Sequence, residues 1–253
     1  MSSELSKINL ERDKRVLGDA WGKTYNSYFS DENNIQSFVS SVIPYLPNHA
    51  LDILYVASAG GILGEALLKE LGQGCLTLVD ISQKHLDSNK NPETKKICAD
   101  LLEMDLGKKF DLILMRSSLD YFPTKTLQVE VLKKIKKHLK PDGLFINQPA
   151  YIGDLADCER ISTAYNTVDK IGDRLFQSSD IAELYREAGF EEPKKIGEGG
   201  VLHISEKEHI ERYGVSREDI KKIQGCLKKC NLYCGVTESG YVMNFDFPIF
   251  LSK

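Results

Sequence analysis

The chain of 253 residues lacks any apolar run near the roughly 18 residues that a membrane-spanning helix needs. It also lacks an excess of basic charge, because its formal net charge is -4, and this argues against a dedicated nucleic-acid binder. The first fifteen residues are polar and charged, unlike the apolar centre of a secretory signal. We therefore expect a soluble, cytoplasmic protein with neither a membrane nor a nucleic-acid partner.

The chain has no paired CxxC units of the kind that hold zinc, although it contains 6 cysteines. Cys226, Cys230 and Cys234 recur every four residues, a spacing that places them along one helix face. Cys75 and Cys98 fall in or beside predicted strands, where small buried thiols are common. We expect packing roles for these thiols and no metal site.

The full GxGxxG dinucleotide fingerprint is also absent, but a related pattern is present. Residues 51–64 read LDILYVASAGGILG, which predicts an apolar strand, a turn of small residues and the start of a helix. Residues 76–80 then predict a second strand that ends in Asp80. Small residues let the backbone approach a ligand closely, and an acid about 20 residues beyond the turn can accept hydrogen bonds from ribose hydroxyls. The unit predicts a nucleotide-like cofactor at one edge of a parallel sheet.

The hydrophobic periodicity from residue 51 onward alternates between strands and helices. The expected strands are 52–57, 76–80, 96–99, 110–115, 143–147, 194–204 and 241–252. The expected helices include 61–71, 181–188 and a long one over 125–139 that Thr124 caps, and a Lys140-Pro141-Asp142-Gly143 turn follows the long helix. This order predicts an α/β fold with a doubly wound, mostly parallel, seven-stranded sheet.

The remaining segments predict helices that form a lid over this sheet. We expect residues 1–48 to be an N-terminal helical lid segment and residues 49–253 to be the Rossmann-like cofactor-binding catalytic domain. Helical insertions are expected in that domain at about 151–176 and 206–238, the second with a capping box at Ser216 and Asp219.

The order of these features resembles the class I S-adenosylmethionine-dependent methyltransferases. The resemblance covers roughly residues 50 to 200 and rests on the small-residue first turn, Asp80, Asp100 after the third strand and the KPDG sequence before the fifth. It implies S-adenosyl-L-methionine as cofactor, with the first turn at its methionine part, Asp80 at the ribose, Asp100 at the adenine and Arg116 near the sulfonium. The implied cofactor-binding residues are Tyr25, Ala57, Ser58, Ala59, Gly60, Gly61, Asp80, Ile81, Asp100, Leu101, Arg116 and Ser117.

The chain departs from the family pattern in its first strand and turn. Tyr55 stands where the family usually has an acid, and Ala57 and Ala59 replace glycines. The added methyl groups are tolerable if both alanines keep a negative φ.

Methyl transfer needs an aligned nucleophile, and it needs a general base only where the acceptor is protonated. Asp120 is the first candidate base because it follows the fourth strand, and its alternative role is to cap the next turn. His203 is the second candidate, Tyr121 is placed to contact the acceptor, and His209 is expected on a solvated helix face. The aromatic segment from Trp21 to Phe29 either closes over the cofactor, whose sulfonium aromatic faces attract, or simply packs.

These features predict a transferase that moves the methyl group to a small-molecule acceptor. The Asn/Asp-Pro-Pro-Tyr/Phe sequence of many base and amide methyltransferases is absent after the fourth strand, which disfavours a DNA target. Two alternatives stay open: an enzyme that attacks the amino-carboxypropyl chain and releases methylthioadenosine, and a non-catalytic binding module. The sequence leaves the methylated atom and the oligomeric state open.

Overall fold

The structure is a computed structural model that describes residues 4, 7, 26–169, 171, 173–228, 230, 233–237 and 240–253. Its sheet has the order β3-β2-β1-β4-β5-β8-β6, and β7 pairs with β8 off this path. The pairs among β1 to β5 are parallel, whereas β8 runs antiparallel to β5, β6 and β7. The strands are β1 Leu51–Val56, β2 Gly74–Asp80, β3 Lys95–Cys98, β4 Phe110–Arg116, β5 Leu139–Gln148, β6 Lys194–Ser205, β7 Tyr233–Thr237 and β8 Gly240–Ser252. The predicted seven-stranded, mostly parallel sheet is confirmed, and β7 extends it by a short hairpin.

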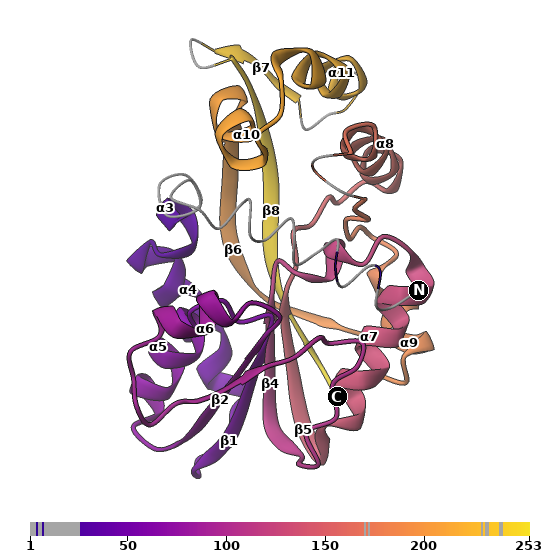
Figure 1. The fold of residues 1–253 in the computed structure, drawn as a ribbon. Helices are drawn as coiled ribbons and strands as arrows, with labels where there is room; N and C mark the ends of the chain where they lie inside the picture. The colour runs from indigo at the N-terminus through magenta and orange to yellow at the C-terminus, as the bar shows by residue number, and fades with distance from the viewer. Residues whose placement is uncertain are drawn as a thin grey trace.

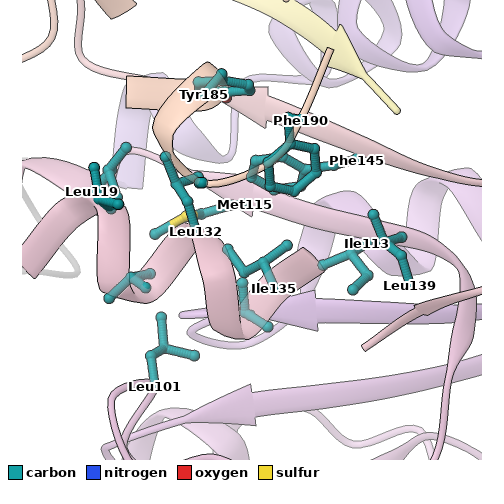
Figure 2. Close-up of a cluster of buried hydrophobic side chains, with 14 of the residues drawn as sticks. Leu101, Ile113, Met115, Leu119, Leu132, Ile135, Leu139, Phe145, Tyr185 and Phe190 are labelled. Carbon is teal, nitrogen blue, oxygen red and sulfur yellow. The ribbon is translucent and has the colours of Figure 1, made fainter. Parts of the chain in front are cut away.

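Two helical layers cover the two faces of the parallel strands (Figure 1). α4 (Glu32–Val42), the 3-10 turn η1 (Ile43–Tyr45), α5 (Ile62–Leu71) and α6 (Gln83–Ser88) follow the first face, where Phe38 and Leu67 are buried in one cluster. On the other face α7 (Lys125–Lys137) and α9 (Ile181–Glu187) pack on β4 and β5. Figure 2 shows Leu132 of α7 in this second cluster with Ile113 of β4 and Phe145 of β5. The predicted doubly wound arrangement is therefore confirmed.

A third cluster lies beyond the sheet core, where β6 and β8 extend upward in Figure 1 and carry further helices. These are α8 (Leu155–Asn166), α10 (Glu206–Tyr213) and α11 (Arg217–Leu227), and Tyr28 of α3 (Asn26–Phe29) joins the same cluster. Of the predicted insertion at 151–176, only 155–166 is helical among the described residues. The expected capping box of α11 is confirmed, because Ser216 and Asp219 bond reciprocally. The division of the chain into a lid segment and a catalytic domain stays a prediction.

Local signals explain the start of α7 but not the strand that follows it. The Thr124 hydroxyl accepts a hydrogen bond from Leu127 N at 3.2 Å, as the predicted cap requires. The predicted turn at residues 140–143 is wrong, because these residues lie within β5. The pairing of β4 with β5 jumps from Phe110–Leu139 to Leu112–Leu144, so the four residues form an irregularity in the strand.

Two expectations about the cysteines also fail: those at two strand positions are not buried, and Cys234 lies in β7 and not on α11, the helix that carries Cys226. Cys75 and Cys98 are exposed, and Cys158 is the buried thiol among these three. Cys75 lies near the start of β2, where the buried residues begin only at Leu76, so the strand pattern does not bury every thiol it contains. Within the described part of the chain, no helix combines the length and the apolar character needed to cross a membrane.

Candidate cofactor and acceptor site

The turn after β1 has an unusual backbone conformation for its sequence. Ala57 and Ala59 both have φ near +47°, and Gly61, which precedes α5, has φ +76°. The expectation of a negative φ at the two alanines is therefore wrong. The turn keeps the left-handed conformation that glycine adopts freely, at a cost of about 1–2 kcal/mol for each alanine. Such strain persists only where the surrounding contacts hold it.

Asp80 supplies the contacts that hold this turn. Its Oδ2 accepts a hydrogen bond from Ala59 N at 2.8 Å, and its Oδ1 accepts one from Ser82 N at 2.9 Å. His85 Nδ1 lies 3.1 Å from the same Oδ1 and must donate, because a carboxylate only accepts. The side chain predicted to bind ribose hydroxyls thus also positions the turn predicted to bind the methionine part.

A second network supports the turn from α5. Glu65 accepts hydrogen bonds from Asn89 at 2.8 Å, Asn91 at 2.9 Å and Thr94 at 2.6 Å, and Asn89 also donates to Gly60 O at 3.1 Å. Burial raises the pKa of Glu65, but these hydrogen bonds outweigh burial and leave the pKa below its ordinary value. The ionised carboxylate therefore joins α5 to the segment between β2 and β3.

The pairing of β1 with β4 aligns Val56 with Met115, which brings Arg116 and Ser117 level with the first turn. Arg116 is buried and donates to Phe29 O at 3.2 Å, and its guanidinium lies 4.6 Å from the centre of the Phe29 ring. Ser117 has φ +46°, and its N–H donates to Gln148 O at 2.8 Å. This edge is thus fixed by contacts from β5 and from the N-terminal segment.

The aromatic segment before α4 packs against this edge. Tyr28 donates to Gly199 O, and its ring lies 5.0 Å from Phe247 and 5.5 Å from the Arg116 guanidinium. Burial raises the pKa of Tyr28 to about 12, although the Arg116 charge opposes that shift. Trp21 and Tyr25, the other aromatic candidates, lie outside the described residues.

The predicted adenine residues follow β3. Asp100 is half-buried, and its Oδ1 accepts from Leu102 N at 2.9 Å, which shapes the loop. Leu101 is buried in the cluster beneath α7, while Ile81 is half-buried beside Asp80. Asp80 O accepts from Ala99 N at 3.0 Å, so the ends of β2 and β3 are adjacent. Adenine contact stays a prediction for these residues.

Tyr55, which replaces the family's acid, is buried in the cluster beneath α4 and α5. Burial raises its pKa to about 12. This phenol therefore stays neutral and serves packing, and it does not supply the charged acceptor that the acid would.

Asp120 and Tyr121 belong to a second group of polar residues, after β4. Asp120 lies in the 3-10 turn η2 (Leu119–Tyr121), is fully buried, and accepts a hydrogen bond on Oδ2 from Arg174 Nη2. Arg174 is also buried, donates to Tyr213 OH at 3.0 Å, and lies 4.2 Å from the centre of the Tyr121 ring. Oδ1 of Asp120 has no hydrogen-bond partner among the described residues. The two predicted residues are thus joined by an arginine that the sequence did not single out.

A small pocket lies against this arginine. Its lining is mainly aromatic and apolar, with Arg174 as its charged member, and it consists of Ala150, Tyr165, Arg174, Phe176, Ile204, Tyr213, Phe245 and Phe247. These residues come from the segment after β5, from α8 and the segment that follows it, from α10, and from β6 and β8. Apolar walls with a few polar groups are typical of small-molecule sites, but this pocket has a volume of only about 10 Å³, the room that one water needs.

The two histidines near this pocket differ from expectation. His209 is fully buried, not solvated: its Nδ1 donates to Ser205 O at 3.0 Å, and its Nε2 accepts from Tyr165 OH at 2.6 Å. His203 is exposed on β6, between the buried Leu202 and Ile204, so the strand directs it away from the pocket face. The sequence missed His209 because its partner Tyr165 comes from a different helix, 44 residues earlier.

The residues around the first turn fit S-adenosylmethionine. Asp80 offers a buried carboxylate, the kind of acceptor that ribose hydroxyls need. Gly61 is the N-cap of α5 and makes no side-chain cap, so the N-terminal N–H groups of this helix suit an anionic group. Packing within the protein requires glycine at Gly60 and Gly61. A Cβ at Gly60 would lie 2.5 Å from Ser88, and a Cβ at Gly61 would lie 2.5 Å from Leu78.

Comparisons with known proteins agree with this geometry. Residues 54–145 match a family model described as a methyltransferase domain. The malonyl-[acyl-carrier protein] O-methyltransferase of Priestia megaterium is 26% identical over 126 residues, which cover 48% of this chain and 45% of that enzyme. The match thus spans less than half the length of that curated relative.

Solved structures share the fold at low sequence identity. The YcgJ protein of Bacillus subtilis has a TM-score of 0.67 at 14% identity, covering 87% of this chain and 96% of that one. The N-methyltransferase NodS of Bradyrhizobium japonicum, solved with S-adenosyl-L-homocysteine, has a TM-score of 0.51 at 15% identity, covering 95% and 97%.

The segment that matches the methyltransferase domain model, residues 54–145, lies in the doubly wound α/β part of the fold. The chain is thus similar to methyltransferases in this segment and in its fold, in agreement with the predicted resemblance to the class I S-adenosylmethionine-dependent methyltransferases.

Proposed function

We propose that this protein transfers the methyl group of S-adenosylmethionine to a small-molecule acceptor. The observation that carries the proposal is the contact between Asp80 and the first turn, which builds a rigid site from Ala59 and a buried carboxylate at the edge of the parallel strands. The cofactor supplies an electrophilic methyl carbon on a sulfonium. The chain has to orient an acceptor toward that carbon and exclude water.

The acceptor in this proposal binds where the small aromatic pocket lies beside Arg174, and the pocket has to widen to admit it. Because Oδ2 of Asp120 is bonded to Arg174, Oδ1 is the atom proposed to accept a proton from an acceptor hydroxyl or amine. Tyr121 is proposed to position the acceptor from beneath Arg174. His203 is the weaker candidate base because its side chain is exposed.

Two other functions remain as alternatives. The loss of the acid at Tyr55 removes an acceptor that would orient the amino-carboxypropyl chain, and this favours attack on that chain as the second candidate. A binding module without catalysis is the third. The name of the Priestia megaterium relative adds a carrier-bound acyl group to the acceptors that we would test.

Mass spectrometry of the nucleoside product distinguishes these functions. Purified protein would be incubated with S-adenosylmethionine and a metabolite extract, with and without an added malonyl-carrier protein. We expect S-adenosylhomocysteine above the protein-free background. Methylthioadenosine would replace the proposal with chemistry on the amino-carboxypropyl chain, and no nucleoside product together with no nucleoside binding would leave a non-catalytic module.

The cofactor site itself is tested by Asp80→Ala. The variant should bind S-adenosylhomocysteine about 1–3 kcal/mol more weakly, because it loses charged hydrogen bonds to the ligand and the acceptor for Ala59 N. Isothermal titration calorimetry measures this change, and Asp87→Ala, at an exposed position on α6, is the matched control. An unchanged affinity in Asp80→Ala would remove Asp80 from the site.

A further inference from the structure

The hydrogen bonds of the Asp80 carboxylate leave little room for a ligand. A carboxylate offers about four lone-pair positions, two on each oxygen. Among the described residues, Ser82 N and His85 Nδ1 take both positions on Oδ1, and Ala59 N takes one of the two on Oδ2. One acceptor position therefore remains, and it is on Oδ2.

A ribose has two neighbouring hydroxyls, and a carboxylate can accept one from each on its two oxygens. The Ser82 and Ala59 bonds come from the backbone and hold the strand end and the first turn, so neither is free to leave. The His85 bond comes from a side chain that can rotate. Full recognition of the ribose thus requires His85 to give up its position on Oδ1.

The local structure permits this movement without loss of α6. The helix is capped by Ser82, whose hydroxyl accepts from His85 N at 3.4 Å, and Leu86 anchors it in the core. Both contacts are independent of the imidazole ring. The ring itself is partly exposed, with 13% of its side-chain surface accessible, so it has a path away from Asp80.

We infer that His85 is a further residue of the nucleoside site: it occupies the position on Asp80 Oδ1 that one ribose hydroxyl takes, and binding of a ribonucleoside displaces it. The inference rests on the proposed function, because it requires an adenosine-containing ligand at Asp80. A ligand with both hydroxyls must break the His85 bond, whereas a deoxynucleoside binds through Oδ2 alone and leaves it intact. His85 therefore reduces the preference of the site for ribose over deoxyribose.

The test compares His85→Leu, which lacks the donor, with the wild-type protein, using calorimetry or ligand-observed NMR. His85→Leu should bind S-adenosylhomocysteine and adenosine about three- to tenfold more tightly, because the ligand no longer displaces a hydrogen bond. Its affinity for 2′-deoxyadenosine should be unchanged. His85→Asn, whose amide can donate from a similar position, should behave like the wild type, and His49→Leu, at an exposed histidine, should have no effect.

A second measurement follows the imidazole directly. In wild-type protein labelled with ¹⁵N, the Nδ1 resonance of His85 should shift when S-adenosylhomocysteine is added and stay unchanged with 2′-deoxyadenosine. If S-adenosylhomocysteine binds but leaves this resonance unchanged, or if His85→Leu weakens binding, the inference fails while the proposed function stands. If neither the wild type nor His85→Leu binds S-adenosylhomocysteine or adenosine, both fail together.

Discussion

Ala57 and Ala59 adopt a left-handed backbone conformation that is unfavourable for alanine. Both have φ near +47°, where a Cβ crowds the backbone, and glycine would adopt the same conformation without that strain. The hydrogen bond from Ala59 N to Asp80 gives a reason for the strain, since it orients the carboxylate that is proposed to bind the ribose. The positions thus keep the glycine-type backbone although they carry a methyl group.

This strain predicts an unusual response to glycine substitution. Ala59→Gly relieves about 1–2 kcal/mol of left-handed strain, and it adds unfolded-chain entropy that costs about 0.5–1 kcal/mol. The free energy of unfolding should therefore stay level or rise by up to about 1.5 kcal/mol. Ala66→Gly in the interior of α5 should instead lower it by about 1 kcal/mol. Urea unfolding of both variants measures the contrast, and an equal loss in the two would show that Ala59 is not strained.

At the scale of single elements, the main feature is the junction of α5 with the segment before β3. Glu65 on α5 accepts from three side chains of that segment, and the same Asn89 that bonds Glu65 also bonds Gly60 O in the first turn. The helix, the segment and the turn therefore form one connected unit, so the geometry of the proposed cofactor site depends on the Glu65 carboxylate.

Glu65→Gln should weaken this unit in a pH-dependent manner. Because the folded-state pKa of Glu65 lies below its ordinary value of 4.5, its contribution to stability is present above that value and is lost as the pH falls through the folded pKa. At pH 7 the variant should be less stable by about 1–2 kcal/mol, and the difference from wild type should shrink as the pH falls below 4.5. Chemical denaturation between pH 3 and 7 tests this, with Glu70→Gln at an exposed position of α5 as control. A gap that stays constant with pH would show that the charge of Glu65 is not involved.

At the scale of the whole molecule, the sequence predicts what local patterns encode. Thr124 capped α7 as expected, the Ser216 capping box formed, and the alternation of strands and helices gave the sheet. The position of Asp80 at the end of β2 could be predicted because the apolar pattern of the strand stops there. The failures are contacts between distant segments: Arg174 meets Asp120 across 54 residues, and His209 is buried by Tyr165 of another helix. Neither partner leaves a periodic signal in the sequence.

The Asp120–Arg174 pair joins the sheet to the third cluster and should decide how cooperatively the two unfold. Asp120 follows β4, while Arg174 contacts Tyr213 of α10 and the Phe176 ring at 5.1 Å. Removing one partner leaves a buried charge without its counter-ion, so Asp120→Asn and Arg174→Gln should each cost about 3–5 kcal/mol. Since the double variant carries neither charge, it should lose less than the sum by about 1–3 kcal/mol.

Denaturant unfolding of the wild type, the two single variants and the double variant measures this coupling energy. The exposed pair Lys137–Asp105 is the matched control, in which no coupling is expected. Hydrogen exchange gives a second measurement: in Arg174→Gln the amides of α8, α10 and α11 should exchange faster, while those of β1 and β4 keep their protection. Additive losses, or equal loss of protection in the sheet, would mean that the pair does not connect two separable parts. Because the pocket proposed for the acceptor lies in the third cluster beside Arg174, the same variants should lower turnover more than they lower the affinity for S-adenosylhomocysteine, which is proposed to bind at Asp80.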